Sequence, residues 1–410
     1  MAVGGMVGGG IFSTLGVVIG IAGRWAWLSF LLAGLIALAA GYSYVKLAEH
    51  YGEGGGAFTF LREIDADGFA GSLSWVLVVG YVLTNAVYAS TFGEYVGHML
   101  DFGPWFPRTA AVAILGVFVA LNLKGVGEAG GVEVFLVWFK LAVLVALAGW
   151  GLAHWNVPML SQGVPDASLA AAVFGASAVF MAYEGFQLLT YDYEDISNPQ
   201  RTLRVSVLSA VVVVIFVYVA IALGTAMITG AGKLAEHGEV ALAIAGQAVA
   251  GTPGLVVVTI GAAFSTGSAI NSTLFATARL ASKVSENGEL PSWIARRNSA
   301  GIPDRAVVTL GTLSAVLAVF GGLSTLVEAA SLAFLFTFAV VCALAFHLEA
   351  GTRMVTGAGA MAAAAATVGL ILRLSRTEPL ALAFLAALVL ISVFGRPILL
   401  SHAKTKSRSD

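Results

Sequence analysis

Long runs of apolar residues, interrupted by short polar segments, extend along almost the whole chain. Charges, prolines and clusters of glycine divide these runs into segments close to the ~20 residues with which a helix crosses the hydrocarbon core of a bilayer. Within each segment the apolar residues are continuous, whereas the strands of a membrane barrel alternate in polarity. The pattern therefore predicts an all-α integral membrane protein with about twelve spans, at residues 1–22, 26–47, 72–98, 107–122, 133–153, 168–190, 205–229, 254–279, 306–323, 326–347, 355–373 and 379–400.

The composition supports this class and excludes several others. Of 410 residues, 59% are hydrophobic and 11% are charged, against about 45–50% and about 25% in soluble domains. The net charge of −2 and the lack of a long basic run argue against a nucleic-acid partner. Cys342 is the sole cysteine, which excludes an intramolecular disulfide and a cysteine-based metal cluster. No P-loop or nucleophile-elbow motif occurs, so we expect no cofactor, no metal and no enzymatic activity.

The distribution of positive charge predicts the orientation of the spans. If the amino terminus lies in the cytoplasm, the inside loops and the tail carry fifteen of the 21 Lys and Arg residues, and the outside loops carry five. This bias predicts that both termini are cytoplasmic. The first span has no basic n-region and no small-residue cleavage site. We therefore expect a working helix of a multi-pass protein in the cell membrane, surrounded by the lipid bilayer, and not a signal peptide.

Glycines are concentrated in the first span, at Gly4, Gly5, Gly8, Gly9 and Gly10. Because glycine is unfavourable in a helix, this segment is expected to have a special backbone role. One interpretation is close helix packing through small residues spaced four apart. The other is a helix that is broken within the membrane, since the amino end of a half-helix presents free N–H groups to an anionic ligand.

The sixth span carries a matching feature at its centre, where residues 180–186 read FMAYEGF. Glu184 lies beside Gly185 in an otherwise apolar stretch. An acidic side chain in the hydrocarbon region costs ~2.5–3.5 kcal/mol by insertion scales, so Glu184 must face a polar interior or a freed backbone group. It either serves a functional site directly or holds an unwound segment by hydrogen bonds without touching a substrate.

Five stretches, in order along the chain, resemble the motifs of the amino acid–polyamine–organocation (APC) family of permeases. Residues 8–12 (GGGIF) are similar to the glycine-rich break in the first helix of these permeases, and residues 182–186 (AYEGF) are similar to the break in the sixth. The other three stretches are GGGAF at 54–58 with LRE at 61–63, NLKGV at 122–126, and EDISNPQRT at 194–202. The resemblance covers nearly the whole chain.

This resemblance implies a LeuT-like fold, in which two inverted repeats of five helices are followed by two extra carboxyl-terminal helices. Helices 1 and 6 are then the broken ones, and the substrate site lies between them. The corresponding divisions are residues 1–153 for the first repeat, 168–347 for the second, 355–400 for the last two helices and 401–410 for a cytoplasmic tail.

By the same resemblance, the α-carboxylate of an amino acid would bind N–H groups of the first break, and its α-amine would meet carbonyl groups of the sixth. A helix amino end stabilises a carboxylate by ~0.3–2 kcal/mol, and unwound carbonyls suit an ammonium. Side-chain selectivity would come from Phe180, Ala182 and Phe186, which favour a small or medium neutral amino acid, or a cationic one if Glu184 points into the pocket. The expected substrate-binding residues are Gly8, Gly9, Gly10, Ile11, Phe180, Met181, Ala182, Tyr183, Glu184 and Phe186.

Lys140 is the basic residue that lies well inside a span, about seven residues into the fifth. Snorkelling from that depth is a long reach, and a desolvated lysine suits a group that gains and loses a proton. In proton-coupled members of the resembled family, a lysine on the fifth helix takes the place of a sodium ion. The resemblance thus implies proton coupling through Lys140, with sodium less expected. Its expected neighbours, whose hydroxyls could equally be ordinary contacts between helices, are Ser265, Thr266 and Ser268.

These inferences predict a secondary active transporter that takes up an amino acid with a proton by alternating access. An amino acid exchanger has the same broken helices and is an alternative, as is a non-transporting sensor or subunit. The last alternative arises because Met1 lies only seven residues before Gly8, where the resembled permeases have a half-helix of roughly a dozen residues. Either the true start lies upstream or the chain is a non-transporting relative, and the otherwise intact pattern favours the former. Gln187 stands where related sequences often carry Asp.

Overall fold

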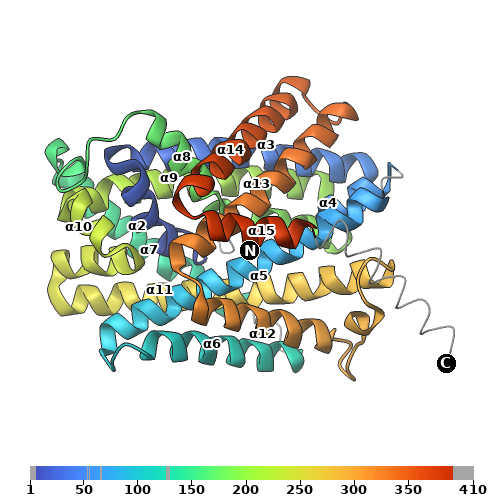
Figure 1. The fold of residues 1–410 in the computed structure, drawn as a ribbon, viewed down its shortest axis with the longest axis horizontal. Coiled ribbons are helices and arrows are strands. Elements are labelled where there is room, and N and C mark those ends of the chain that lie inside the picture. Colours follow the sequence, from blue (N-terminus) through green and yellow to red (C-terminus); the bar gives the residue numbers. More distant parts are fainter. Residues whose placement is uncertain (1–5, 53, 55, 65–66, 126–129, 391–410) are drawn as a thin grey trace.

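The computed structural model describes residues 6–52, 54, 56–64, 67–125 and 130–390, and within these ranges every regular element is a helix (Figure 1). This confirms the prediction of an all-helical chain. The elements, with η denoting 3-10 helices, are α2 (Gly10–Ala22), η1 (Gly23–Trp25), α3 (Ala26–Tyr51), α4 (Gly56–Arg62), α5 (Asp67–Leu100), α6 (Phe106–Leu123), α7 (Gly130–Ala153), η2 (Val157–Leu160), α8 (Ala170–Ala178), η3 (Phe180–Tyr183), η4 (Phe186–Asp195), α9 (Pro199–Thr229), α10 (Ala231–Glu236), η5 (Gly238–Val240), α11 (Ala241–Glu286), η6 (Ser292–Ala295), α12 (Asp304–Phe320), α13 (Leu323–His347), α14 (Arg353–Thr377) and α15 (Pro379–Leu390).

Eight helical segments in the described part of the chain are long and apolar enough to cross a membrane. Two of the eight are composite, because one comprises α2, η1 and α3 and another comprises η5 and α11. The chain is therefore a multi-pass helical membrane protein. The eight segments are Gly10–Tyr51, Gly68–Leu100, Phe106–Leu123, Val134–Ala153, Pro199–Thr229, Gly238–Glu286, Leu323–His347 and Arg353–Thr377.

Three predicted spans are not among these eight segments. Residues 168–190 form the short helix α8 followed by η3 and the start of η4. Residues 306–323 correspond to α12, which has 17 residues. The span predicted at 379–400 is described as far as Leu390, in α15, and its remainder lies outside the described residues, as do Gly4 and Gly5 of the first span.

α11 is kinked close to where the sequence predicts the eighth span to begin, at residue 254. Ala250 and Gly251 have non-helical backbone angles, with Gly251 at φ 61°, and Pro253 follows two residues later. A positive φ is readily adopted by glycine, and proline removes a backbone donor from a helix interior. The kink therefore has a local cause in the sequence.

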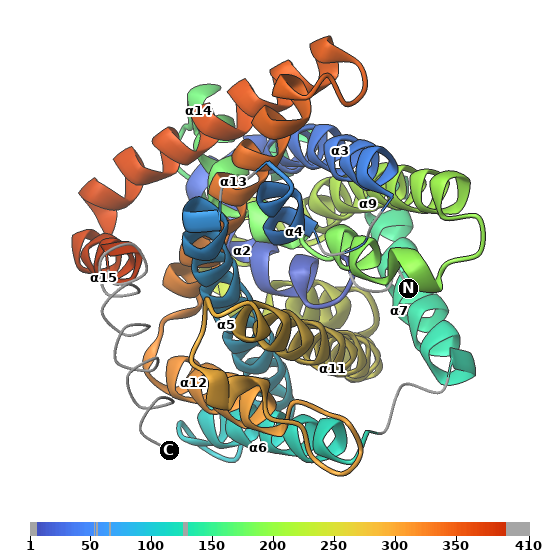
Figure 2. The same cartoon turned by 90° about the vertical axis from the view of Figure 1, so that its right-hand side faces the viewer.

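The helices α5 and α11 lie against each other in the interior of the bundle, and α6 and α12 form one of its outer edges (Figure 2). α3 packs on α9, and α6 packs on α12. α7 packs on both α9 and α11, while α13 packs on both α3 and α5. The short helix α2 contacts α3, α5, α8, α10, α11 and α13, so the segment that begins at the first glycine cluster is surrounded by six other α-helices.

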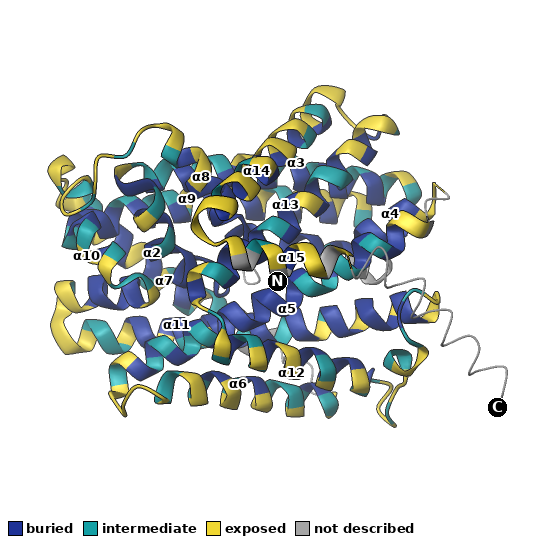
Figure 3. Cartoon of the chain, viewed as in Figure 1, coloured by how far each residue is buried: buried dark blue, intermediate teal, exposed yellow. Residues whose placement is uncertain are grey.

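The outward faces of the bundle carry exposed residues (Figure 3), and many of these residues are large and hydrophobic. Large side chains are exposed on the outer helices, including Val117 on α6, Phe216 on α9 and both Leu313 and Val316 on α12. A helix that is apolar on its outer as well as its inner face suits a bundle surrounded by lipid. Figure 3 shows buried residues concentrated in the interior elements, such as α2 and α5.

Close approach of α7 and α9 depends on two glycines. A Cβ atom added to Gly151 would overlap the backbone of Gly224, and one added to Gly224 would meet the backbone of Ala148. Small residues at such points let helix backbones approach closely within membranes. In contrast, Gly149 on α7 has open space around the position of a Cβ atom.

We expect Gly151→Val to lower the thermal stability of the purified protein, because the added side chain meets the Gly224 backbone and overpacking costs about 1–3 kcal/mol. Gly149→Val is the matched control, because it adds the same side chain to the same helix in open space. Size-exclusion chromatography of heated detergent-solubilised samples measures the difference. Equal losses of stability in both variants would contradict a close contact between α7 and α9.

Candidate functional site

The first glycine cluster interrupts the helical backbone. Met6 is helical, Val7, Gly8 and Gly9 form a turn, and α2 begins at Gly10. The first backbone hydrogen bond of α2 runs from the N–H of Ser13 to the carbonyl of Gly9, at 3.0 Å. The amino end of this 13-residue helix therefore lies at a buried position in the bundle, where its first N–H groups have no partner within the helix.

The second interruption lies in the sixth predicted span. α8 ends at Ala178, and η3 is followed by Glu184 in an extended conformation, with φ −66° and ψ 149°. Gly185 then has φ 123°, a value that residues other than glycine rarely adopt. Glu184 and Gly185, the acid and the glycine that stand out in the sequence, thus mark the point at which the chain leaves η3 and enters η4.

The two interruptions meet directly. A Cβ atom added to Gly10 would lie 2.7 Å from the carbonyl oxygen of Ala182 and 2.8 Å from the hydroxyl oxygen of Tyr218. That hydroxyl, on α9, donates to the carbonyl of Met6 at 2.7 Å, with the carbonyl of Ala182 at 3.1 Å as a second acceptor. One tyrosine therefore joins the backbone on both sides of the contact, and glycine at position 10 makes the approach sterically possible.

Two serines on other helices pair with further backbone groups at the interruptions. Ser265 of α11 donates to the carbonyl of Val7 at 2.7 Å and also contacts the carbonyl of Gly8. Ser331 of α13 donates to the carbonyl of Ala178 at 2.7 Å and accepts a hydrogen bond from the N–H of Met181 at 3.0 Å. Because no water is available in the bilayer core, such side-chain partners are what allows the backbone to leave the helical pattern there.

Glu184 is 2% exposed, and its carboxylate is held by neighbouring polar groups. Tyr88 donates to one carboxylate oxygen at 3.3 Å, and the amide nitrogen of Gln187 donates to the other at 3.2 Å. The same nitrogen lies 3.1 Å from the hydroxyl of Tyr81, and the amide oxygen of Gln187 accepts the N–H of Gly185 at 3.0 Å. These bonds match the alternative in which the carboxyl group holds an unwound segment.

The remaining expected substrate-binding residues are all buried, and their side chains point in several directions. Phe180 and Phe186 both pack against Phe338 of α13, with ring centroids 5.5 and 5.3 Å apart. Tyr183 donates to the carbonyl of Phe30 in α3 at 2.7 Å. The structure therefore brings the backbones of the two interruptions together. The aromatic side chains of the second interruption contact α3 and α13 instead of the first interruption.

Lys140 is 1% exposed and lies on α7, a helix that packs against both α9 and α11. The adjacent Phe139 meets Phe264 of α11 edge to face at 6.2 Å, which places Lys140 near the level of Ser265. Thr266 is buried and donates to the carbonyl of Ala262 in its own helix at 2.8 Å. Ser268 is half-buried. Of the three expected hydroxyl neighbours, Ser265 is the one that the structure places on the first interruption.

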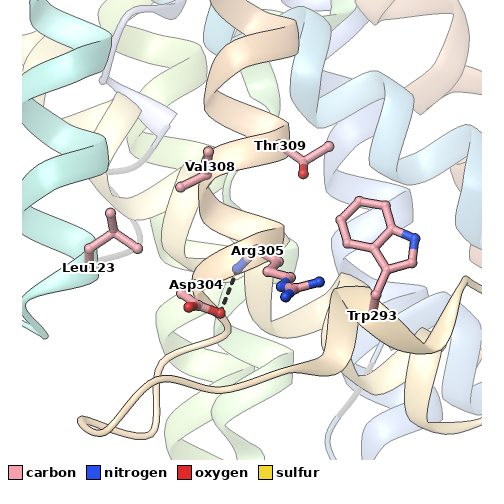
Figure 4. A pocket seen from close by; sticks show the side chains of 6 residues that line it. All are labelled: Leu123, Trp293, Asp304, Arg305, Val308 and Thr309. Carbon is pink, nitrogen blue, oxygen red and sulfur yellow. Dashed lines mark hydrogen bonds between the residues drawn. The ribbon is translucent and has the colours of Figure 1, made fainter.

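Two cavities occur elsewhere and contain none of the expected residues. The larger, about 330 Å³, lies where α6 ends and α12 begins, with Asp304 and Arg305 at the start of α12 (Figure 4). The smaller, about 120 Å³, lies between α5, α6 and η5, and its lining includes Glu94, Arg108 and Glu239. Within the described residues, no group of three or more His, Cys, Asp or Glu side chains could hold a metal ion.

The helices and their packing are those of a multi-pass membrane protein, and two interrupted helical segments are in contact inside the bundle. A family model described as amino acid permease matches residues 1–398. The chain therefore belongs to the amino acid permease family, within the APC group, a class of transport proteins and not of enzymes.

Individual relatives agree with this assignment. The chain is 32% identical over 285 residues to an uncharacterized protein of Methanocaldococcus jannaschii, covering 68% of this chain and 65% of the relative. It is 30% identical over 281 residues to the inner membrane transport protein YbaT of Escherichia coli, covering 67% and 65%. The serine/threonine exchanger SteT of Bacillus subtilis is 22% identical over 288 residues, covering 68% and 65%. The chain thus spans about two thirds of the length of these relatives.

Sequence reasoning identified the two interruptions but missed Tyr218 and Ser331. The available signal was a polar side chain within an otherwise apolar run, as at Tyr218 in the stretch 211–226. Hydroxyl groups are common in membrane helices, so that signal alone does not distinguish a residue that joins two segments.

We expect Tyr218→Phe to destabilise the protein more than Tyr183→Phe does. Both hydroxyls are buried, but that of Tyr218 serves carbonyls at both interruptions, whereas that of Tyr183 serves a carbonyl within α3. A buried polar group left without a partner costs about 1–3 kcal/mol. Thermal unfolding of the two purified variants measures the difference, and indistinguishable midpoints would show that the Tyr218 hydroxyl does not join the interruptions.

Proposed function

We propose that this protein is a secondary active transporter of the cell membrane that takes up an amino acid together with a proton by alternating access. The observation that carries the proposal is the contact between the two interruptions, made at Gly10 and Ala182 and bridged by Tyr218. Half-helix ends that meet within a membrane bundle provide both an anion-binding amino end and free carbonyl groups. An amino acid carries the two complementary charges.

The packing of the helices supports a LeuT-like arrangement of twelve spans, with residues 1–153 and 168–347 as inverted repeats. In that arrangement α3 corresponds to α9, α5 to α11 and α6 to α12, and each of these pairs is in contact. The cross-contacts also correspond: α7 packs on α9 and α11, just as α13 packs on α3 and α5. α14 and α15 fall outside the two repeats and lie against α13.

The proposed substrate is a small or medium neutral amino acid. Its carboxylate binds the amino end of α2 near Gly10 and Ile11, and its amine binds carbonyl groups of η3. Both oxygens of Glu184 already accept hydrogen bonds from Tyr88 and Gln187, which leaves a cationic substrate less favoured. The name of one relative, a serine/threonine exchanger, is compatible with a small neutral substrate.

Lys140 is the proposed proton-coupling residue. It is buried on α7, and the contact of the adjacent Phe139 with Phe264 lies near the level at which Ser265 contacts the first interruption. A charge at this depth is costly, and ionisable residues inside membranes mark ion and proton pathways. We therefore expect a change in its protonation state to alter the electrostatic potential at the amino end of α2.

Lys140→Met is expected to abolish proton-driven uptake, since it removes the titrating group while keeping a long apolar side chain. The measurement is uptake of labelled neutral amino acids into proteoliposomes with an inward proton gradient and no sodium. Lys124→Met, which changes an exposed lysine at the end of α6, is the matched control and should retain uptake. Unchanged uptake and pH dependence in Lys140→Met would exclude this coupling role.

The same vesicles separate the alternative functions. Uptake that ignores the proton gradient but requires amino acid inside the vesicle would identify an exchanger. If neither condition gives uptake, for this chain or for one extended upstream of Met1, a sensor or non-transporting subunit becomes the better description.

The proposed orientation, with both termini in the cytoplasm, can be read from single introduced cysteines because the native Cys342 is buried. Asp166→Cys, in an exposed loop before α8, should react with an impermeant maleimide in intact cells. Ser299→Cys, in an exposed loop before α12, should react only after the membrane is permeabilised. The reverse labelling pattern would invert the topology.

A further inference from the structure

Asn85 on α5 is a buried amide with unmet hydrogen bonds. Its side chain is 1% exposed, and neither its nitrogen nor its oxygen has a hydrogen-bond partner within the described residues. Burial of a polar group without a partner costs about 1–3 kcal/mol, and an amide has both a donor and an acceptor to satisfy. Such a group in a native interior needs an explanation, and one explanation is a ligand that binds there.

The position of Asn85 on α5 relates it to the candidate site. It follows Tyr81 by four residues and precedes Tyr88 by three, so the three side chains lie on neighbouring parts of one helix face. The hydroxyls of Tyr81 and Tyr88 contact Gln187 and Glu184 at the second interruption. The ring of Tyr88 also lies where a side chain at position 9 would be, against the first interruption. Asn85 therefore sits between two residues that border the site.

We propose that Asn85 binds the side chain of the transported amino acid, and that the substrates are neutral amino acids with a hydroxyl or carboxamide group. This inference rests on the proposed transport function and narrows its substrate class. A hydroxyl or carboxamide can both donate and accept, so it satisfies both halves of the Asn85 amide. An aliphatic side chain leaves both halves unmet. A carboxylate offers no donor and brings a second negative charge near Glu184.

A site that is built to hydrogen-bond a substrate group discriminates strongly against an analogue that lacks it, because the polar groups of the protein are then left unpaired. Asn85 should therefore contribute to the preference for polar over apolar side chains. The amino and carboxylate groups, which bind elsewhere in the proposed site, are common to both kinds of amino acid and do not depend on it.

The test measures ligand-induced shifts of the thermal unfolding midpoint for the purified full chain. The probes are L-serine, L-threonine, L-asparagine and L-glutamine, compared with L-alanine, L-valine and L-leucine. Asn85→Leu replaces the amide by an apolar group of similar size. Thr91→Val is the matched control: Thr91 is also a buried hydroxyl without a partner on α5, but it lies about 120° around the helix from Asn85.

The expected result has two parts. Without ligand, Asn85→Leu should unfold at the same temperature as the wild type or higher, because it removes an unsatisfied buried amide. With ligand, its affinity for the polar amino acids should fall at least tenfold, while Thr91→Val keeps wild-type affinities. The first part establishes that a loss of binding does not come from misfolding.

Two results would overturn the inference, and they are distinguishable. If Asn85→Leu binds the polar amino acids as tightly as the wild type, or if the wild type binds only the apolar ones, Asn85 does not recognise the side chain, while the proposed amino acid transport stands. If none of the amino acids shifts unfolding of the wild type, and none competes for uptake in vesicles, the proposed function fails and this inference fails with it.

Discussion

Every backbone N–H and C=O group within a bilayer needs a hydrogen-bond partner from the protein itself, and the interior of this bundle depends on that constraint. A continuous helix satisfies it internally, whereas an interrupted one does not. Here the carbonyl groups at the two interruptions are paired with Tyr218 on α9, Ser265 on α11 and Ser331 on α13. These helices come from distant parts of the chain, so the interruptions are a property of the assembled bundle.

The second interruption adds a carboxylate to the same constraint. Glu184 is acceptable at a 2% exposed position because Tyr88 and Gln187 donate to its two oxygens. Gln187 in turn contacts Tyr81 and the N–H of Gly185, so one short polar chain links the interrupted backbone to α5. A fully partnered network of this kind rigidifies a core, while a partly partnered one is costly. The stability of this network therefore depends on where the hydroxyls of Tyr81 and Tyr88 lie along α5.

The sequence was most informative where a residue conflicts with its local surroundings. Glycines in a predicted span, and an acid beside a glycine in an apolar run, located residues 8–10 and 184–185, and both places are interruptions in the structure. The packing that joins them could not be predicted, because it is a contact between Gly10 and Ala182 across a large sequence separation. The role of Tyr218 could not be predicted for the same reason, because it depends on two acceptors that are distant in the sequence, the carbonyls of Met6 and Ala182. The roles of the buried residues in binding and coupling stay predictions.

The contacts differ in how readily they can change, and this difference bears on the proposed transport cycle. Most of the side-chain hydrogen bonds at the interruptions are made by hydroxyl groups, whose hydrogens can rotate to suit their acceptors, and each bond contributes only about 0.5–1.5 kcal/mol net. The contact of Gly151 with Gly224 is backbone against backbone and leaves no space for a side chain. Helices packed this closely suit a rigid part of the bundle, whereas the interruptions, which lack a continuous helical hydrogen-bond ladder, suit a part that bends. Lys140 lies on α7, which packs on α9, so the proposed change in its charge would act next to the helix whose Tyr218 contacts both interruptions.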